Sequence, residues 1–165
     1  MKPEECERAG QIVVEAYRAL PGHVEEPSYE RELADVASRA DSAFVAVDED
    51  GSVVGCVTVV MGADSAHAEF DDPAAAGFRM LGVDPARQGS GAGRALVAWC
   101  VDAARAAGRE RIIIHSTPWM TRAHAMYARF GFERRPELDW EPVPNIDLWG
   151  FVLELRATPD PGPGT

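Results

Sequence analysis

Hydrophobic residues recur at helical spacing in two stretches near the start of the chain. The first, residues 3–19, places Ile12, Val13 and Ala16 on one face, and the second, residues 28–40, repeats the pattern. A spacing of three to four residues is typical of an amphipathic helix with one buried side. The sequence therefore predicts two helices before any strand.

From residue 43 onward the pattern changes to short runs rich in β-branched residues, which is typical of strands. Residues 111–115 contain three consecutive isoleucines, an apolar run that is expected in a sheet covered on both faces. Helical spacing returns over 94–107 and again in a stretch that starts with Thr117 as N-cap and Pro118 in the first turn and ends at Gly131. The predicted strands are 43–47, 52–61, 76–83, 111–115, 132–134 and 148–155, with a loop over 62–75.

The order of the predicted elements indicates an α/β fold. Strands and helices alternate in the second half of the chain, which is typical of a mixed central sheet with helices on both faces. No internal repeat or linker divides the sequence, so we expect a single domain over residues 1–156. Residues 157–165 are rich in proline and glycine and are predicted to form a flexible tail.

Composition and charge narrow the classes of function. The 165 residues carry a formal net charge of −11, which disfavours a nucleic-acid partner because phosphate contacts need lysine and arginine. No apolar run approaches the roughly 20 residues of a membrane span, and the start MKPEECERAG lacks the apolar core of a secretory signal. The three cysteines are widely separated and form neither a disulfide framework nor a metal pair. Together these features predict a cytoplasmic protein without a membrane partner.

One segment differs from the acidic remainder, because residues 81–135 carry nine basic and four acidic residues. Inside it, a turn over Gln88–Arg94 has glycine at every second position and separates a predicted strand from a predicted helix. Glycine lets the backbone approach a ligand closely, and a helix start offers unpaired N–H groups and the positive end of the helix dipole. This arrangement predicts a phosphate-binding site, flanked by the charges of Arg87 and Arg94.

Two common phosphate-binding motifs do not fit this turn. The Walker motif needs a lysine after its last glycine, and the turn has none. The dinucleotide fingerprint Gly-x-Gly-x-x-Gly needs a glycine where Arg94 or Leu96 stands. A nucleotide-binding domain is therefore disfavoured. The pattern that fits is Gln88-x-x-Gly91-x-Gly93 at a strand-to-helix turn.

With this pattern the sequence resembles the GNAT superfamily of N-acetyltransferases, whose pyrophosphate loop is Gln/Arg-x-x-Gly-x-Gly/Ala before a helix of alanine and leucine. A second motif of the family, Ala-x-x-x-Tyr-x-x-x-Gly-Phe, occurs at the expected distance, over residues 123–132. The family's form of this motif begins with an asparagine, where the chain has Met120. The resemblance is strongest over residues 76–133 and implies the acyl-CoA N-acyltransferase fold of the family.

The resemblance implies acetyl-CoA as the cofactor and indicates which residues would hold it. The end of the strand before the turn, including Leu81 and Val83, would hydrogen-bond the pantetheine arm. Met120 would contribute a weaker contact than the asparagine it replaces. The backbone amides of the turn would bind the pyrophosphate, and its residues are Gln88, Gly89, Ser90, Gly91, Ala92, Gly93 and Arg94.

Such an enzyme would join an amine to the acetyl group and release the CoA thiolate. Tyr127 is the candidate acid, because a phenol beside the cofactor can protonate or hydrogen-bond the leaving sulfur; the alternative is a core aromatic on its helix. The backbone amide of Leu81 is the candidate donor to the oxyanion. Many relatives carry a glutamate base on the strand before the turn, and this chain has none there. The candidate bases are the acidic residues of the upstream loop, Glu69, Asp71 and Asp72.

In relatives the acceptor binds between two segments, here Pro21–Tyr29 and Asp139–Asp147, and both are acidic, which suits a cationic amine. We expect acetyl transfer to a primary amine, either a small molecule or a peptide N-terminus, by direct attack in a ternary complex. A homodimer is an option. The alternative is a catalytically silent CoA-binding sensor or scaffold, because the strand glutamate is missing. No histidine has metal-ligand spacing: His115 is expected to be structural and His124 exposed.

Overall fold

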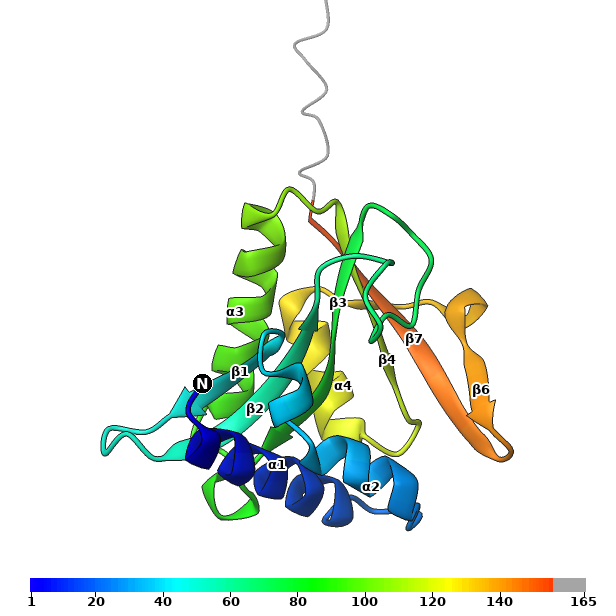
Figure 1. Ribbon diagram of the computed structural model, residues 1–165. Helices are drawn as coiled ribbons and strands as arrows, with labels where there is room; N and C mark the ends of the chain where they lie inside the picture. Colours follow the sequence, from blue (N-terminus) through cyan, green and yellow to red (C-terminus); the bar gives the residue numbers. More distant parts are fainter. Residues whose placement is uncertain (156–165) are drawn as a thin grey trace, which may run out of the picture.

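The computed structural model describes residues 1–155, which form a seven-stranded sheet with two helices on each face (Figure 1). The α/β fold class predicted from the sequence is confirmed. The predicted tail over residues 157–165 lies outside the described residues. The helices are α1 (Pro3–Arg18), α2 (Pro27–Ala34), α3 (Ala92–Ala106) and α4 (Thr121–Phe130). The strands are β1 (Ala43–Val47), β2 (Val53–Val60), β3 (Ala75–Val83), β4 (Arg111–Ser116), β5 (Glu133–Arg134), β6 (Trp140–Val143) and β7 (Ile146–Glu154).

The sheet is mixed, with the strand order β1-β2-β3-β4-β7-β5, and β6 pairs with β7. All pairs are antiparallel except β3 with β4, the central pair, which is parallel. Only Ala75 and Ala76 of β3 pair with β4, opposite Arg111 and Ile112. The two strands therefore separate toward their carboxyl ends and leave an opening in the middle of the sheet.

Two large apolar clusters lie between the sheet and its helices, and a small third one surrounds Ile113. One lies under α3 and α4 and includes Val57, Phe78 and Leu96. The other lies under α1 and α2 and includes Ile12 and Leu33. The three cysteines are buried and free, and burial raises the pKa of Cys56 to about 11 and that of Cys100 to about 12. These thiols are packing groups, since a thiol with such a pKa is not ionised near neutral pH.

The second helix ends earlier than its hydrophobic pattern predicts. Residues 28–40 were expected to form one helix, but α2 ends at Ala34 and a short 3₁₀ helix follows at Ala37–Arg39. The reason is Arg39, which is only 4% exposed and donates to the carbonyl oxygens of Glu32, Leu33 and Asp35, the last at 2.7 Å. A cation that satisfies the final carbonyls of a helix ends it there. Its Nε donates to Thr58 Oγ1 at 3.0 Å, which ties α2 to the sheet.

Two further predictions need correction. The fourth helix was expected to start with Thr117 as N-cap, but Thr117–Met120 forms a turn and α4 begins at Thr121. The Thr117 hydroxyl is buried without a hydrogen-bond partner among residues 1–155, so it caps nothing. The strand β6 was not predicted, because its four residues include a proline and are all exposed, which gives no alternation.

Candidate active site

The glycine-rich turn connects β3 to α3, and its backbone needs glycine at two positions. Gly89 and Gly91 have φ angles of +84° and +88°, in the left-handed region that side chains disfavour. A Cβ at either position would meet nothing within 4 Å, so the surface over the turn is open. Gly93 differs from them: a Cβ there would make an ordinary contact, 3.4 Å from Val83, so the packing of α3 on β3 does not require glycine at this position.

The start of α3 presents backbone N–H groups that lack acceptors. The first hydrogen bond of the helix runs from the Ala95 N–H to the Gly91 oxygen at 2.9 Å. Within the described chain, the N–H groups of Ala92, Gly93 and Arg94 donate to no backbone or side-chain oxygen. Unpaired amides at the positive end of a helix dipole form an anion-binding site. The structure thus gives this turn the geometry that the sequence predicted for it.

The charged residues beside the turn differ in availability. Arg87 pairs with Asp48 of the β1–β2 turn at 3.1 Å, and Arg122 of α4 donates to Gln88 Oε1 at 3.0 Å. Arg94 forms no ion pair with any residue from 1 to 155. Of the two arginines predicted to flank the turn, Arg94 is the one whose charge remains free for a ligand.

A bulge in β3 shapes the opening between β3 and β4. Met80 has a φ angle of +53°, and the pairing with β2 slips by one residue at this point. Ala76 and Phe78 belong to the cluster under α3, but Met80 belongs to the cluster under α1, because the bulge reverses the alternation of the strand. Leu81 and Val83 follow the bulge at the edge of the opening, directly before the glycine-rich turn.

Tyr127 reaches this opening from α4. Its side chain is 6% exposed and packs against the rings of Phe78 and Phe132, at centroid distances of 5.8 and 5.7 Å. Burial raises the pKa of its phenol, so the group stays protonated at neutral pH. Burial likewise raises the pKa of the Tyr17 phenol on α1, which covers the opposite face of the sheet.

Met120, predicted to contact the cofactor, is the residue before α4, and its Sδ lies 3.2 Å from Ser116 Oγ at the end of β4. This places it at the same end of the sheet as the carboxyl end of β3. The structure thus brings Met120, Tyr127 and the residues after the β3 bulge to the two sides of one opening.

Glu69 is a partly buried member of a polar cluster. Its carboxylate lies 3.0 Å from Arg79 Nη2 on β3 and 3.7 Å from His115 Nδ1 on β4, and its side chain is 14% exposed. Burial raises the pKa of Glu69, and the neighbouring charges of Arg79 and His115 oppose that shift. The His115 ring is fixed from its other side, where Nε2 lies 2.9 Å from the Leu138 oxygen.

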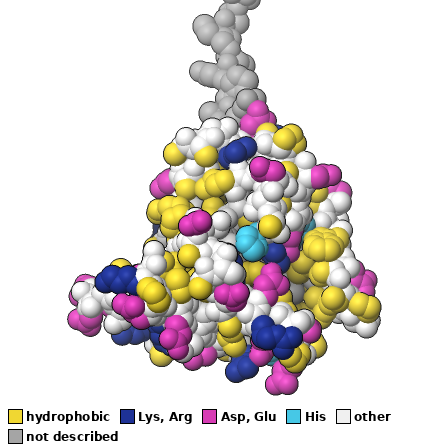
Figure 2. Space-filling model, viewed as in Figure 1, with side chains coloured by type: hydrophobic (Ala, Val, Ile, Leu, Met, Phe, Trp, Pro, Cys, Tyr) yellow, Lys and Arg dark blue, Asp and Glu magenta, His cyan; other side chains and the backbone are white. Residues whose placement is uncertain are grey.

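Tyr17 and Tyr29 complete the cluster from the helical side. Their rings are edge to face with centroids 6.1 Å apart, and burial raises the pKa of both phenols. The charge of Arg79 opposes this rise in both pKa values, whereas the charge of Glu69 adds to the rise at Tyr29. We call the set Tyr17, Tyr29, Glu69, Arg79 and His115 the cleft cluster. Figure 2 shows this face, where histidine, arginine and acidic side chains gather between helix α2 and the hydrophobic β6–β7 hairpin.

Several acidic residues predicted to attract a cationic acceptor have structural roles instead. Glu26 caps α2 by accepting from the Tyr29 N–H at 2.6 Å. Asp139 pairs with Arg134 and accepts from the Gly150 N–H at 2.9 Å. Glu141 accepts from the Asn145 N–H in the hairpin. Of the other predicted bases, Asp72 is bound to Arg111 and to the Ala74 N–H.

His124 is not exposed as expected. Its Nε2 lies 3.0 Å from Ser116 Oγ, its ring stacks on Trp149 at 5.9 Å, and burial lowers its pKa. Arg134 covers the same indole at 4.6 Å. The sequence did not indicate Tyr17 or Arg79 as site residues, because each lies in an ordinary helix or strand pattern, whereas Tyr29 ends the segment Pro21–Tyr29 that was predicted to bind the acceptor. A charged residue within the apolar strand over 76–83 is the one signal that could have drawn attention to Arg79.

A family model described as "Acetyltransferase (GNAT) family" matches residues 10–132 of the chain. Among solved structures, a GNAT-family acetyltransferase from Staphylococcus aureus is 12% identical with a TM-score of 0.73, and the match covers 94% of this chain and 96% of that one. The protein yncA from Salmonella typhimurium, solved with its cofactor acetyl-CoA, is 21% identical with a TM-score of 0.63, covering 98% and 95% of the two chains.

A GCN5-related N-acetyltransferase from Kribbella flavida is 22% identical with a TM-score of 0.67, covering 94% and 95%. At these identities the structural matches show a shared fold. No curated protein matches the chain. No helix among residues 1–155 combines the length and the apolar character needed to cross a membrane.

Proposed function

The chain belongs to the acetyltransferase (GNAT) family, and we propose that it transfers the acetyl group of acetyl-CoA to a primary amine by direct attack in a ternary complex. The observation that carries this proposal is the position of the unpaired amides of α3 beside the opening between β3 and β4. A phosphate held by those amides would let the pantetheine arm enter the opening, at the end where Tyr127 and Glu69 approach from opposite faces. Residues 1–156 would act as one catalytic domain.

The cofactor contacts in this proposal use the backbone more than side chains. The turn Gln88–Arg94, with Gly89, Ser90, Gly91, Ala92 and Gly93, would bind the pyrophosphate through N–H groups, and Arg94 would add a charge. Leu81 and Val83 would hydrogen-bond the pantetheine amides, because β4 leaves that edge of β3 unpaired beyond Ala76. Met120 would offer an apolar contact.

Acetyl-CoA supplies the acetyl group as a reactive thioester. Glu69 would remove a proton from the ammonium form of the acceptor, directly or through a water molecule, so that the nitrogen can attack the carbonyl carbon. The Leu81 N–H would donate to the oxyanion that develops as the new C–N bond forms. The nitrogen then carries one proton more than the product amide, and it would lose this proton to water as the intermediate collapses. Tyr127 would donate its proton to the sulfur as the C–S bond breaks, and would recover a proton from solvent.

The environments of the two residues suit these opposite roles. Burial keeps Tyr127 protonated and hence a donor. Burial also raises the pKa of Glu69, and a carboxylate with a raised pKa is a stronger base than an exposed one. Arg79 at 3.0 Å opposes this rise, because its positive charge stabilises the ionised carboxylate. The missing strand glutamate is thus replaced by a loop glutamate that packs against β3 and β4.

The acceptor would enter from the face of α1 and α2. Tyr17 and Tyr29 supply aromatic walls, and Glu69 supplies a negative charge, which together suit an ammonium group carried on an apolar or aromatic body. Solved structures that share the fold include one named for phosphinothricin N-acetylation and the NatC complex bound to Gag peptide and CoA. The fold alone therefore does not determine the acceptor class, and we assign acceptor selection to the side chains of the cleft cluster.

The test is a steady-state assay of free CoA with acetyl-CoA and a panel of amines that includes polyamines, amino acids and short peptides. We expect acetyl-CoA to bind and at least one amine to release CoA at a rate above hydrolysis, with the acetylated amine confirmed by mass spectrometry. Tight acetyl-CoA binding without turnover on any amine would favour the silent CoA-binding module. Absence of acetyl-CoA binding by the folded protein would contradict both.

A further inference from the structure

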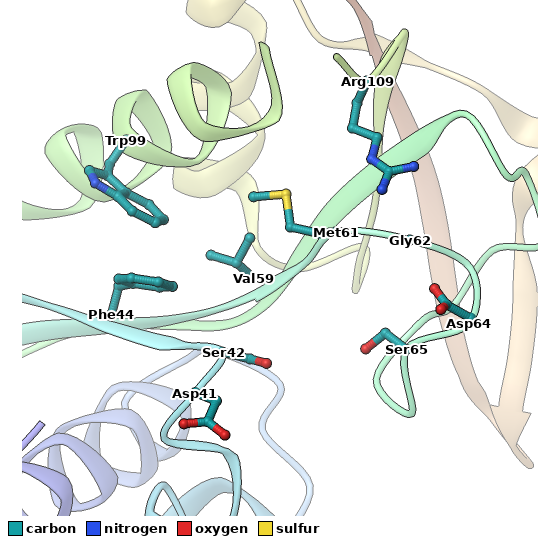
Figure 3. A pocket seen from close by; sticks show the side chains of 10 residues that line it. All are labelled: Asp41, Ser42, Phe44, Val59, Met61, Gly62, Asp64, Ser65, Trp99 and Arg109. Carbon is teal, nitrogen blue, oxygen red and sulfur yellow. The ribbon is translucent and has the colours of Figure 1, made fainter. Parts of the chain in front are cut away.

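A cavity of about 400 Å³ lies between the start of β1, the end of β2 and the side of α3 (Figure 3). None of its lining residues belongs to the glycine-rich turn, to the opening between β3 and β4 or to the cleft cluster. It also lies at the opposite end of β2 from the glycine-rich turn, because Gly55 near the start of β2 pairs with Val83, whereas the cavity is lined by Val59 and Met61. The cavity is therefore separate from the proposed active site.

One end of the cavity is aromatic. Phe44 of β1 and Trp99 of α3 stack with centroids 3.9 Å apart and ring planes at 32°. Trp99 is 41% exposed, although it lies on a helix whose other large apolar residues are buried. Met61 continues the apolar floor toward the other end (Figure 3). An exposed indole beside such a floor offers a stacking surface for a flat or branched apolar group.

The other end carries unpaired charges of both signs. Arg109 donates from Nη1 to the Pro73 oxygen at 3.2 Å, but its Nε is buried and has no hydrogen-bond partner in the described structure. A Cβ built on Gly62 would lie 2.6 Å from Asp64 Oδ1 and 3.9 Å from Arg109 Nη2, so the two charges flank this glycine without forming an ion pair. Asp41 lines the same cavity and has no ion pair among residues 1–155. Figure 3 shows Arg109 and Asp64 at the end away from Trp99.

We propose that this cavity binds a zwitterionic amino acid with a bulky apolar side chain. The ligand's carboxylate would accept from the guanidinium of Arg109, whose Nη2 lies beside Gly62 of the cavity wall, its ammonium group would face Asp64, and its side chain would lie along Met61 to Trp99 and Phe44. Asp64 and Arg109 lie at the same end of the cavity without pairing, so a ligand that carries both charges can pair with each of them, whereas a simple anion or cation leaves one of the two unpaired. A volume of about 400 Å³ is within the usual range for small-molecule sites.

The proposal is tested by calorimetry with the full chain, saturated with CoA, and L-phenylalanine as the probe. CoA without an acetyl group prevents turnover of the probe as an acceptor. Two half-ligands, 3-phenylpropionate and phenethylamine, should bind more weakly than the amino acid, because each lacks one charge. Equal binding of either half-ligand would overturn the proposed charge recognition, and no binding of L-phenylalanine at millimolar concentration would overturn the site.

Variants of the lining residues test whether L-phenylalanine binds in the cavity. Arg109→Gln should weaken L-phenylalanine affinity roughly 10- to 100-fold, because it removes a charged partner of the carboxylate. Asp64→Asn and Trp99→Leu should also weaken it, which keeps the proposal testable if one variant folds poorly. Two control variants should leave the affinity for L-phenylalanine unchanged. Arg105→Gln lies on α3, like Trp99, but outside the cavity, and Glu69→Gln lies in the cleft cluster. Loss of binding in Glu69→Gln but not in Arg109→Gln would assign the amino acid to the acceptor site and overturn the proposal.

Discussion

The two halves of the proposed active site are built in different ways. The cofactor side is a continuous segment in which glycine at 89 and 91 sets the backbone and the start of α3 supplies the N–H groups. The cleft side is a set of side chains from α1, α2, the loop before β3, and strands β3 and β4. A backbone site tolerates changes in most of its side chains, whereas a side-chain site changes its chemistry with a single substitution. Family membership therefore says more about the cofactor than about the acceptor.

The largest expected effect is at Tyr127, which lies where the two halves meet. Tyr127→Phe should lower kcat roughly 10²–10⁴-fold, because it removes the proton donor to the leaving thiolate. The ring and its contacts with Phe78 and Phe132 remain, so acetyl-CoA affinity and Tm should change little. The measurement is kcat on one acceptor together with the Kd of acetyl-CoA.

The matched control for this variant is Tyr17→Phe, which removes the hydroxyl of a tyrosine on α1, on the opposite face of the sheet. It should lower kcat far less. If Tyr127→Phe stays within twofold of the wild type, Tyr127 is a core aromatic. If both variants lose activity equally, the loss comes from the shared environment and not from a specific acid.

The second effect tests the cleft side alone. Glu69→Gln should lower kcat about 10²-fold while leaving acetyl-CoA affinity unchanged. In the wild type the base is active only when ionised, and burial raises its pKa. Activity should therefore fall as the pH decreases through a value above the roughly 4.3 of an exposed glutamate.

This acid limb of the pH profile should disappear in Glu69→Gln. Asp71→Asn is the control, because Asp71 is an exposed acid in the same loop. Asp71→Asn should keep the kcat of the wild type and the same fall in activity at low pH. An unchanged limb in Glu69→Gln would show that another group takes the proton.

The difference between the two halves also explains what the sequence could and could not predict. Helices and strands follow the local periodicity of apolar residues, and the phosphate turn follows the spacing of glycines within seven residues. The sequence could therefore predict these elements and the turn. The early end of α2 depends on Arg39 folding back onto carbonyls and on Thr58, which is 19 residues away. The pairing of Glu69 with His115 depends on the packing of a loop against the sheet. Such contacts have no local pattern, because the chain segments that make them are placed by the fold.

The third effect tests the cofactor side. Gly91→Asp should weaken acetyl-CoA binding roughly 10- to 100-fold, because it places a negative charge at the amides and strains a φ angle of +88°. Gly108→Asp is the control, since Gly108 lies just after α3 with a φ angle of +70° and equally open surroundings. This control introduces a similar backbone strain and the same negative charge, but at a position outside the glycine-rich turn. Calorimetry with acetyl-CoA that shows equal Kd values for the two variants would contradict the assignment of the turn.

The smallest expected effect concerns long-range charge on the cofactor side. Residues 81–135 carry a net charge of +5, but the structure neutralises much of it: Arg111 pairs with Asp72 and Glu154, and Arg134 pairs with Asp139. Near the turn, Arg94 keeps an unpaired charge. Because the screening length shortens to about 3 Å at 1 M salt, acetyl-CoA affinity should fall by a few-fold between low and high salt. Arg94→Gln should weaken binding at low salt and flatten this dependence, whereas Arg105→Gln on the far half of α3 should do neither. A flat response in the wild type would leave the amides, and not the basic segment, as the source of phosphate affinity.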